Sequence, residues 1–472
     1  MQMNAELGWL SLLPSLLAIL VAIISRRVIW ALLGGVIFAY GLLYSPDLST
    51  AALAAGEGLY GTLVDPGNLM LWGFTLAIGA LFGVLEQGGT FGSFVQALEN
   101  KQWVHSRKRA RLFTWVLGVI VFIESNVSIM TSGTTSRPVY DRLGISRQKL
   151  AYIIDSTCAP VCILIPLNAW GAFNLGLIGQ QEVEQPLMVF AGSVLLNAYA
   201  IFALFLALWV AWTGWTIGPM KAYELTAQDD YAKRQSTTKA APDAVNKGAV
   251  ATVILSLVSM VVLVPAMLVY TGDGKLVAGS GMFSVFVAIY AALFIAIVGT
   301  LVSIPNSVGN VVRGIVRGAR DILPLAVILW LAIALGDVTK SLGTGDYLTG
   351  LLNTSVPFML IPVLVFILSG ITAFAIGSSW GTFALMIPLA VPLALGLGIP
   401  VPLLIGAALA GGIFGDHASP ISDTTIMASL ASGSDHIAHV RTQLPYALLA
   451  AAATIVFYLL AGMFVEVTRV AS

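Results

Sequence analysis

Apolar stretches of about 20 residues, separated by short polar segments, make up most of this chain. A helix of that length crosses the ~30 Å hydrocarbon core of a bilayer. The first stretch, 7–24, lacks a basic leading segment and a small-residue cleavage site, so we expect an uncleaved first helix. Lys and Arg gather between the stretches, at 26–27, 99–111, 137–149, 221–247, 313–320 and 441. The positive-inside rule places these segments in the cytoplasm and both termini outside.

Two neighbouring basic segments indicate that one apolar stretch does not cross the membrane. Segments 99–111 and 137–149 both belong in the cytoplasm, so the chain between them must enter the membrane and return on the same side. We predict a re-entrant hairpin that turns at Glu124, Ser125 and Asn126. Its arms of about 13 residues would reach about 20 Å, past the middle of the bilayer but short of the far side.

A second hairpin is predicted in the other half of the chain, entering from the opposite side. Its apolar arms lie over 358–395, and Ser378, Ser379 and Trp380 lie at the expected tip. The flanking segments contain few bases, as a hairpin that enters from outside requires.

The two halves show weak similarity to each other at an offset of about 255 residues: Leu76 pairs with Leu331, and Pro138 with Pro392. Each half is predicted to contain three spans, a hairpin, a broken span and a final span. Because each half therefore crosses the membrane an odd number of times, the second half is inverted relative to the first. The predicted fold class is therefore an all-α polytopic membrane protein with two inverted repeats. The first repeat is 1–213, the second is 248–472, and 214–247 is a cytoplasmic linker that resembles a solvated tether. Such repeats with broken helices are typical of transporters, whose solute binds near the midplane.

The composition places the whole chain in a membrane. Hydrophobic residues make up 58% of the 472 residues and charged residues 10%, which excludes a soluble protein of this length. We expect a multi-pass protein of the bacterial cytoplasmic (inner) membrane, in contact with the lipid bilayer, with no cofactor and no nucleic-acid partner. A homodimer is one possible assembly.

Polar side chains gather between residues 416 and 425, inside apolar surroundings. Ionisable groups at mid-bilayer depth are costly and mark function. Pro420 and nearby glycines predict a broken helix, whose freed backbone groups can line a solute site. We predict cation ligands at Asp155, Asp416, Asp423, Ser419 and Thr424. Further solute-facing residues are expected at Glu124, Ser125, Asn126, Ser156, Thr157, Asp337, Ser378, Ser379, Trp380, His417 and Ser422.

The sign of the charges favours a cation as the solute. The predicted membrane segments contain no Lys or Arg, and their six acids are Glu86, Glu124, Asp155, Asp337, Asp416 and Asp423. A carboxylate without a basic partner must be protonated or hold a cation, because a bare buried charge is too costly. Carboxylate, hydroxyl and carbonyl oxygens suit a hard cation such as sodium. A carboxylate for which proton and sodium compete provides the minimal chemistry of exchange, and His417 is placed to tune that competition near neutral pH.

The residues from 414 to 446 resemble a known transporter family. The run 414–425 and the residues that follow it are similar to the signature of the NhaC-type sodium/proton antiporter family, as are the segments 155–160 and 377–382. The residues after the run that carry the resemblance are Asp435, His436, His439, Arg441, Gln443 and Tyr446. The resemblance covers about 70 to 450. It implies exchange of sodium for protons and distant kinship to the ion transporter superfamily, which is built from hairpins and broken helices. Family relatives are associated with sodium/proton exchange, malate and lactate exchange, or amino-acid transport.

Other interpretations of these residues stay open. The carboxylates would otherwise cap helix ends, and the polar hairpin tips would otherwise only close turns. His436 and His439 are expected in a solvated cytoplasmic loop. The main functional alternative is a sodium- or proton-coupled transporter of an amino acid or a small organic anion of the malate or lactate type, because Asn168, Trp170 and Trp380 leave room for an organic solute.

Two further classes fit the sequence less well. An enzyme is not expected: Asp337 and Asp141 partly match the motifs of an intramembrane aspartyl protease, but Asp141 lies among cytoplasmic arginines, so no pair of acids shares a proton. A channel is the other rival, and counterflow driven by a gradient would distinguish an exchanger from it.

Overall fold

The structure of the protein is a computed structural model. It describes residues 7–25, 27–99, 106–122, 125–165, 168–181, 183–233, 246–275 and 279–471. Helices account for the regular structure of these residues, and no β-strand occurs among them. The first half contains the short 3₁₀ helix η1 (Gly8–Leu12) and helices α1 (Leu13–Ser25), α2 (Val28–Leu43), α3 (Leu48–Val64), α4 (Pro66–Gln87), α5 (Thr90–Glu99), α6 (Arg107–Ile120), α7 (Ser125–Leu143), α8 (Arg147–Leu164), α9 (Ala169–Gly179), α10 (Pro186–Leu195) and α11 (Ala198–Thr213).

One helix, α12 (Met220–Lys233), lies between the two halves. The second half contains α13 (Lys247–Thr271), α14 (Gly281–Ser303), α15 (Val308–Ser341), α16 (Thr344–Ser355), the 3₁₀ turn η3 (Phe358–Leu360), α17 (Ile361–Ile376), α18 (Ser379–Leu397), α19 (Val401–Ala418), α20 (Asp423–Ser432) and α21 (His436–Ala471).

The described helices include nine that are long and apolar enough to cross a membrane, or up to eleven spans if each bent helix pair counts as one. A helix satisfies its own backbone hydrogen bonds, which the bilayer interior requires. The predicted class, an all-α multi-pass membrane protein, is therefore confirmed.

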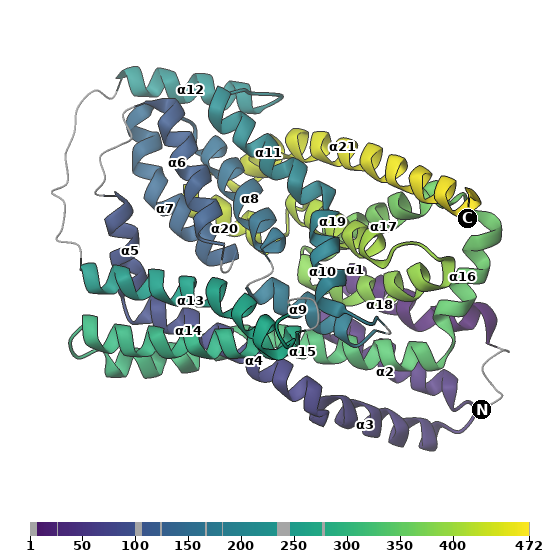
Figure 1. Ribbon diagram of the computed structural model, residues 1–472. Helices are drawn as coiled ribbons and strands as arrows, with labels where there is room; N and C mark the ends of the chain where they lie inside the picture. The colour runs from purple at the N-terminus through teal and green to yellow at the C-terminus, as the bar shows by residue number, and fades with distance from the viewer. Residues whose placement is uncertain are drawn as a thin grey trace.

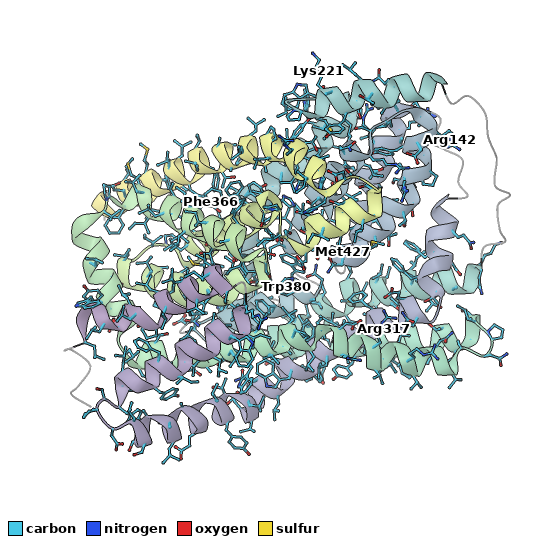
Figure 2. The ribbon with its side chains drawn as sticks, turned by 180° about the vertical axis from the view of Figure 1, so that it is seen from behind. Arg142, Lys221, Arg317, Phe366, Trp380 and Met427 are labelled. Carbon is cyan, nitrogen blue, oxygen red and sulfur yellow. The ribbon has the colours of Figure 1, made fainter. Side chains whose placement is uncertain are left out.

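The long helices run in roughly the same direction, as Figure 1 shows for α4, α13, α14, α15 and α21. Helices α5 and α16 cross this direction near opposite ends of the bundle. Both ends of the described chain lie at the end where α16 lies, and α12 lies at the other (Figure 1). Figure 2 shows Arg142, Lys221 and Arg317 toward the side away from the chain ends, with Trp380 near the middle of the molecule.

Four glycines allow α4 and α15 to cross with their backbones in contact. A Cβ atom on Gly83 would fall on the carbonyl of Gly314, and one on Gly79 would fall on the carbonyl of Gly318. In both helices the two glycines are four positions apart, the small-residue spacing that lets membrane helices approach closely. This is the most extensive helix pairing in the fold.

Helix bounds in the second half repeat those of the first at a shift of 254 residues. Adding 254 to the bounds of α7 (125 and 143) gives 379 and 397, the bounds of α18. The same addition converts the bounds of α8 (147 and 164) into those of α19 (401 and 418). The ends of α4 and α15, at 87 and 341, also differ by 254. The shift agrees with the offset of the weak sequence similarity.

Asp155 does not lie at the bend of the span that carries it, so it does not have the position of a helix cap. Helix α8 runs without interruption through Asp155 and Pro160 to Leu164, so Asp155 does not cap a helix. The C-cap residue Ile165 has an extended backbone (φ −107°, ψ 103°), because the proline that follows it in the sequence disfavours helical geometry at that position. Asn168 then caps α9, and the two helices bend by 44°.

Part of the segment between the halves is packed on the bundle, whereas the sequence suggested a solvated tether. Glu224 of α12 accepts hydrogen bonds from the backbone nitrogen of Ser146 (2.9 Å) and from its hydroxyl (2.5 Å). Its other carboxylate oxygen lies 2.9 Å from Nζ of Lys149, which also donates to the carbonyl of Gly214 (3.1 Å). Because Ser146 caps α8, these contacts hold α12 against the start of that helix.

Candidate functional site

The helix break expected near Pro420 is present, and serines organise it. Helix α19 ends at Ala418, α20 begins at Asp423, and residues 419–422 connect them. The Ser419 hydroxyl donates to the carbonyl of Phe374 in α17 (2.7 Å), and Ser422 caps α20 by accepting from the nitrogen of Thr425 (3.3 Å). Ser422 therefore takes the capping role at α20 that the sequence left open for Asp423, while Ser419 ties the break to α17.

Asp416 lies in the last turn of α19 and is buried. The negative end of the helix dipole disfavours a carboxylate there, so helix stability does not explain the acid. The Ser379 hydroxyl, at the start of α18, donates to Oδ2 of Asp416 (3.2 Å), and Ser422 is another close neighbour. In the described part of the chain, Oδ1 of Asp416 has no hydrogen-bond partner.

The turn between α17 and α18 packs directly on the break. Gly377 ends α17 in the left-handed region (φ +73°), which favours glycine. A Cβ atom there would lie 2.6 Å from the carbonyl oxygen of Ile421, so the close approach also requires glycine. Ser378 caps α18 by accepting from the nitrogen of Gly381 (3.4 Å). The close packing of Gly377 against Ile421 places Ser379 next to Asp416.

Asp155 lies in the middle of α8 and joins three helices. Its Oδ2 atom accepts from Gln443 (2.7 Å) and lies 3.3 Å from Nε2 of His439, both on α21, and it also accepts from the hydroxyl of Thr425 on α20 (3.1 Å). The side chain is fully buried, and Oδ1 has no hydrogen-bond partner among the described residues.

His417 connects the two acids. It follows Asp416 in sequence, and its Nε2 lies 2.9 Å from the backbone carbonyl of Asp155. Because a carbonyl only accepts, Nε2 carries a hydrogen, and in the neutral ring Nδ1 accepts from the hydroxyl of Tyr199 (3.3 Å). Gln443 links the same groups, since it donates to Asp155 and to the carbonyl of His417 (2.9 Å).

The sequence matches a transporter family over residues 161–463, which is more than half of the chain; the family is described as the Na+/H+ antiporter family. This chain belongs to the Na+/H+ antiporter family. The match includes Asp416 and its surroundings, while Asp155 precedes the matched segment.

This family member is similar in sequence to antiporters and in fold to solved transporter structures. An uncharacterized protein of Haemophilus influenzae is 31% identical over 96% of this chain and 90% of its own length. The malate-2H(+)/Na(+)-lactate antiporter of Bacillus subtilis is 38% identical over 22% of this chain and 23% of its own length. The crystal structure of the YdaH transporter of Alcanivorax borkumensis has the same fold, with a TM-score of 0.57 and 14% identity over 96% of this chain and 98% of that one. Antiporters are not enzymes, in agreement with the expectation from the sequence.

Several predicted residues of this antiporter-family member lie on helices α7, α8 and α20. Thr424 shares a hydrogen bond with Ser422 (3.0 Å). Ser156 and Thr157 are buried next to Asp155 in α8, and Ser125 is buried at the start of α7. Asn126 follows it in the same helix, and Glu124 lies outside the described residues.

Asp423 is exposed and accepts from the nitrogen of Thr424 (2.9 Å), and it lies close enough to Asp416 for the two charges to interact. Two other predicted residues lie apart from the buried acids. Trp380 packs against Trp170 (ring centroids 4.7 Å apart) and Phe173 (5.1 Å), so it forms part of an aromatic cluster with α9. Asp337 is exposed near the end of α15, where its charged neighbours are Lys340 and Asp65.

The expectation that His436 and His439 lie in a solvated loop is wrong. Both belong to α21, whose first turn Asp435 caps by accepting from the nitrogen of Ala438 (2.8 Å). His439 is fully buried against Asp155, and His436 bridges the carbonyl of Pro420 (2.7 Å) and the hydroxyl of Ser429 (3.1 Å).

Sequence reasoning assigned no site role to Tyr199, Thr425, His439 or Gln443, although all four contact the acids or His417. One signal was available: His439 and Gln443 are four residues apart, so a helix starting at 436 places them on one face. Within the described residues no group of three or more His, Cys, Asp and Glu side chains has metal-binding geometry. The arrangement is therefore two separate carboxylates joined by hydrogen bonds.

Proposed function

We propose that this protein exchanges sodium ions for protons by secondary active transport, using Asp155 and Asp416. One observation carries the proposal: both acids are buried, and each keeps one carboxylate oxygen without a hydrogen-bond partner in the described part of the chain. Buried polar atoms are rarely left unpaired unless a ligand or ion completes them. Among the described residues no Lys or Arg contacts either acid, so a proton or a cation must balance the charge.

The surroundings of Asp416 suit sodium. Ser379 and Ser422 place hydroxyl oxygens next to its carboxylate. Hard cations prefer oxygen ligands of this kind. Ser419, Thr424 and Asp423 lie at the break between α19 and α20 and remain proposed ligands of the ion as it enters or leaves.

The surroundings of Asp155 suit a proton that competes with the ion. Its carboxylate already receives donors from Thr425 and Gln443, and two histidines adjoin it. Histidine titrates closer to neutral pH than any other side chain. Sodium binding should therefore weaken as pH falls, because protons then occupy the carboxylates that the ion needs.

The same architecture supports an NhaC-type antiporter with two inverted repeats, in a bacterial cytoplasmic membrane with both termini outside. The helix bounds recur at a shift of 254 residues, as for α7 (125–143) and α18 (379–397), which supports repeats at 1–213 and 248–472. The location of α5 and α16 at opposite ends supports inversion, and the shared side of Arg142, Lys221 and Arg317 supports the orientation (Figures 1 and 2).

The test uses purified protein in proteoliposomes with a pH dye inside. Asp416→Asn keeps the size of the side chain and removes the charge, so sodium-driven proton movement should stop while the protein still inserts. Asp321→Asn is the matched control, because Asp321 is exposed on α15 and should be replaceable at no cost to transport. Exchange by Asp416→Asn at the parental rate would return this acid to a structural role.

A second candidate is sodium- or proton-coupled transport of a small organic anion. The partial likeness to the malate-2H(+)/Na(+)-lactate antiporter favours it, and the aromatic cluster of Trp170, Phe173 and Trp380 adjoins the hairpin tip. The same vesicles, challenged with sodium alone and then with sodium plus malate, lactate or amino acids, separate the two. Proton movement that requires the organic solute would favour this second candidate over simple exchange.

A further inference from the structure

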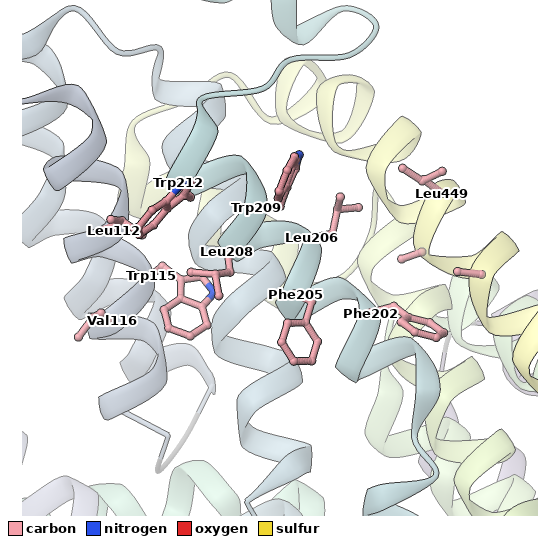
Figure 3. Close-up of a pocket in the computed structure, with 12 residues that line it drawn as sticks. Leu112, Trp115, Val116, Phe202, Phe205, Leu206, Leu208, Trp209, Trp212 and Leu449 are labelled. Carbon is pink, nitrogen blue, oxygen red and sulfur yellow. The ribbon is translucent and has the colours of Figure 1, made fainter.

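An apolar groove of about 830 Å³ opens on the surface of the bundle between α6, α11 and α21. Figure 3 shows its walls, with Leu112 and Trp115 from α6, Phe205, Trp209 and Trp212 from α11, and Leu449 from α21. No charged residue lines it, and none of the residues around Asp155 and Asp416 contributes to it. Phe205 and Trp209 are 64% and 58% exposed, so the groove faces the surroundings of the bundle.

One end of the groove is strongly basic. The first turn of α6 carries Arg107, Lys108 and Arg109 and no acid. Lys108 precedes the groove residues Leu112 and Trp115 by four and seven positions, and Arg109 precedes Leu112 and Val116 by three and seven. These spacings place both bases on the face of α6 that lines the groove. The Nζ atom of Lys108 lies 3.3 Å from the ring centroid of Trp212, which lines the groove itself.

Lys108 and Arg109 are available to bind an anion. Among the described residues no acid pairs with Lys108 or Arg109, and Arg107 instead donates to the carbonyl of Leu143 (2.9 Å). The start of α6 adds the positive end of a helix dipole at the same place. Tryptophan side chains are typical of the membrane interface, where a lipid headgroup meets its acyl chains.

We propose that the groove binds an anionic phospholipid, with an acyl chain along the aromatic wall and the phosphate at Lys108 and Arg109. A basic end at the cytoplasmic side of an apolar groove matches the two parts of such a lipid. A second copy of the chain fits less well, because a two-fold contact through this surface would bring the same bases together. A soluble phosphate compound would leave the apolar wall uncovered.

Native mass spectrometry of the delipidated full-length protein tests the proposal. The probes are phosphatidylglycerol and phosphatidylcholine with identical acyl chains. The protein should bind phosphatidylglycerol roughly 30-fold more tightly, because each base near an anionic headgroup contributes about a factor of five. The double variant Lys108→Gln/Arg109→Gln should lose this preference. The charge-matched control Arg313→Gln/Arg320→Gln, on exposed positions of α15, should keep it.

Two further experiments test the acyl-chain contact and the phosphate contact separately. Ala453→Trp should block binding without changing any charge, because Ala453 lines the groove and is exposed. Soluble glycerol phosphate in excess should fail to displace the bound lipid. Equal binding of the two lipids, an unchanged preference in the Lys108/Arg109 variant, or displacement by glycerol phosphate would each overturn the proposal.

Discussion

Replacing Glu224 with glutamine tests how firmly helix α12 is held against the start of α8. The carboxylate accepts two hydrogen bonds from Ser146 and pairs with Lys149, whose side chain is 1% exposed. Glu224→Gln keeps the size and one acceptor oxygen, which Ser146 engages, but it removes the negative charge that balances the buried Lys149 ammonium group. Removing one member of a buried ion pair costs about 3–5 kcal/mol. Because the side chain of Glu224 is 10% exposed, we expect a value near the lower bound, about 3 kcal/mol.

Limited trypsin digestion measures this loss, because cleavage after Lys221 requires α12 to leave the bundle. The cleavage rate follows the population of the open form when opening is fast. With about 1.4 kcal/mol per factor of ten, cleavage should accelerate about 100-fold in Glu224→Gln. Thr226→Ala is the control in the same helix, since the Thr226 hydroxyl is exposed and bonds only to the carbonyl of Ala222.

The double variant Lys149→Met/Glu224→Leu separates a lost pair from a general loss of packing. Replacing both members of a buried pair by apolar residues is often neutral or stabilising, so cleavage should return toward the parental rate. The reasoning would be refuted by a Glu224→Gln protein that is cleaved within about threefold of the parental rate, which corresponds to less than about 1 kcal/mol.

Three further variants test other parts of the structure. Gly83→Ala places a Cβ atom on the Gly314 carbonyl and should destabilise the protein by about 1–3 kcal/mol in thermal unfolding. The control Gly41→Ala should have no effect, because no atom lies within 4 Å of the added Cβ. Equal unfolding midpoints for the two variants would contradict the close helix crossing. Gln443→Leu removes the hydrogen bonds donated to Asp155 and to the His417 carbonyl. Because a hydrogen bond to a charged group contributes about 1.5–3 kcal/mol, sodium-driven proton flux in proteoliposomes should fall about tenfold or more. Flux at the parental rate would exclude a role for Gln443. Single cysteines at the exposed positions Asp346 and Arg142 should react with an impermeant reagent from outside and from inside, respectively, and labelling of both from one side would disprove the proposed orientation.

Local features of the chain could be predicted because their causes are local. Pro420 and the polar residues around it cannot continue an apolar helix, and the break at 419–422 lies where they predicted it. The turn at 377–378 was also predictable, because Gly377 ends a helix in the left-handed region and Ser378 caps the next helix. Composition alone established the membrane class.

Contacts between distant segments could not be predicted in the same way. His439 and Gln443 are 284 and 288 residues away from Asp155, and nothing in their local sequence identifies that partner. The mixture of charges around His439 resembled a solvated loop, although the Asp435 cap starts a helix there. The polar composition of α12 indicated a solvated tether for the same reason, because the residues that Glu224 contacts, Ser146 and Lys149, are distant in the sequence.

The two acids of the proposed site do not correspond to each other under the shift that relates the helices. Adding 254 to 155 gives 409, and subtracting 254 from 416 gives 162, so the counterparts are Leu409 and Cys162, both fully buried and neutral. The hydroxyl that reaches Asp416 does have a counterpart, because Ser379 corresponds to Ser125. The scaffold is thus similar in the two halves while the charges are not. An exchanger with one acid in the middle of α8 and another at the end of α19 has two chemically different places for a cation, which is why Asp155→Asn and Asp416→Asn should differ in the pH dependence of any transport that remains.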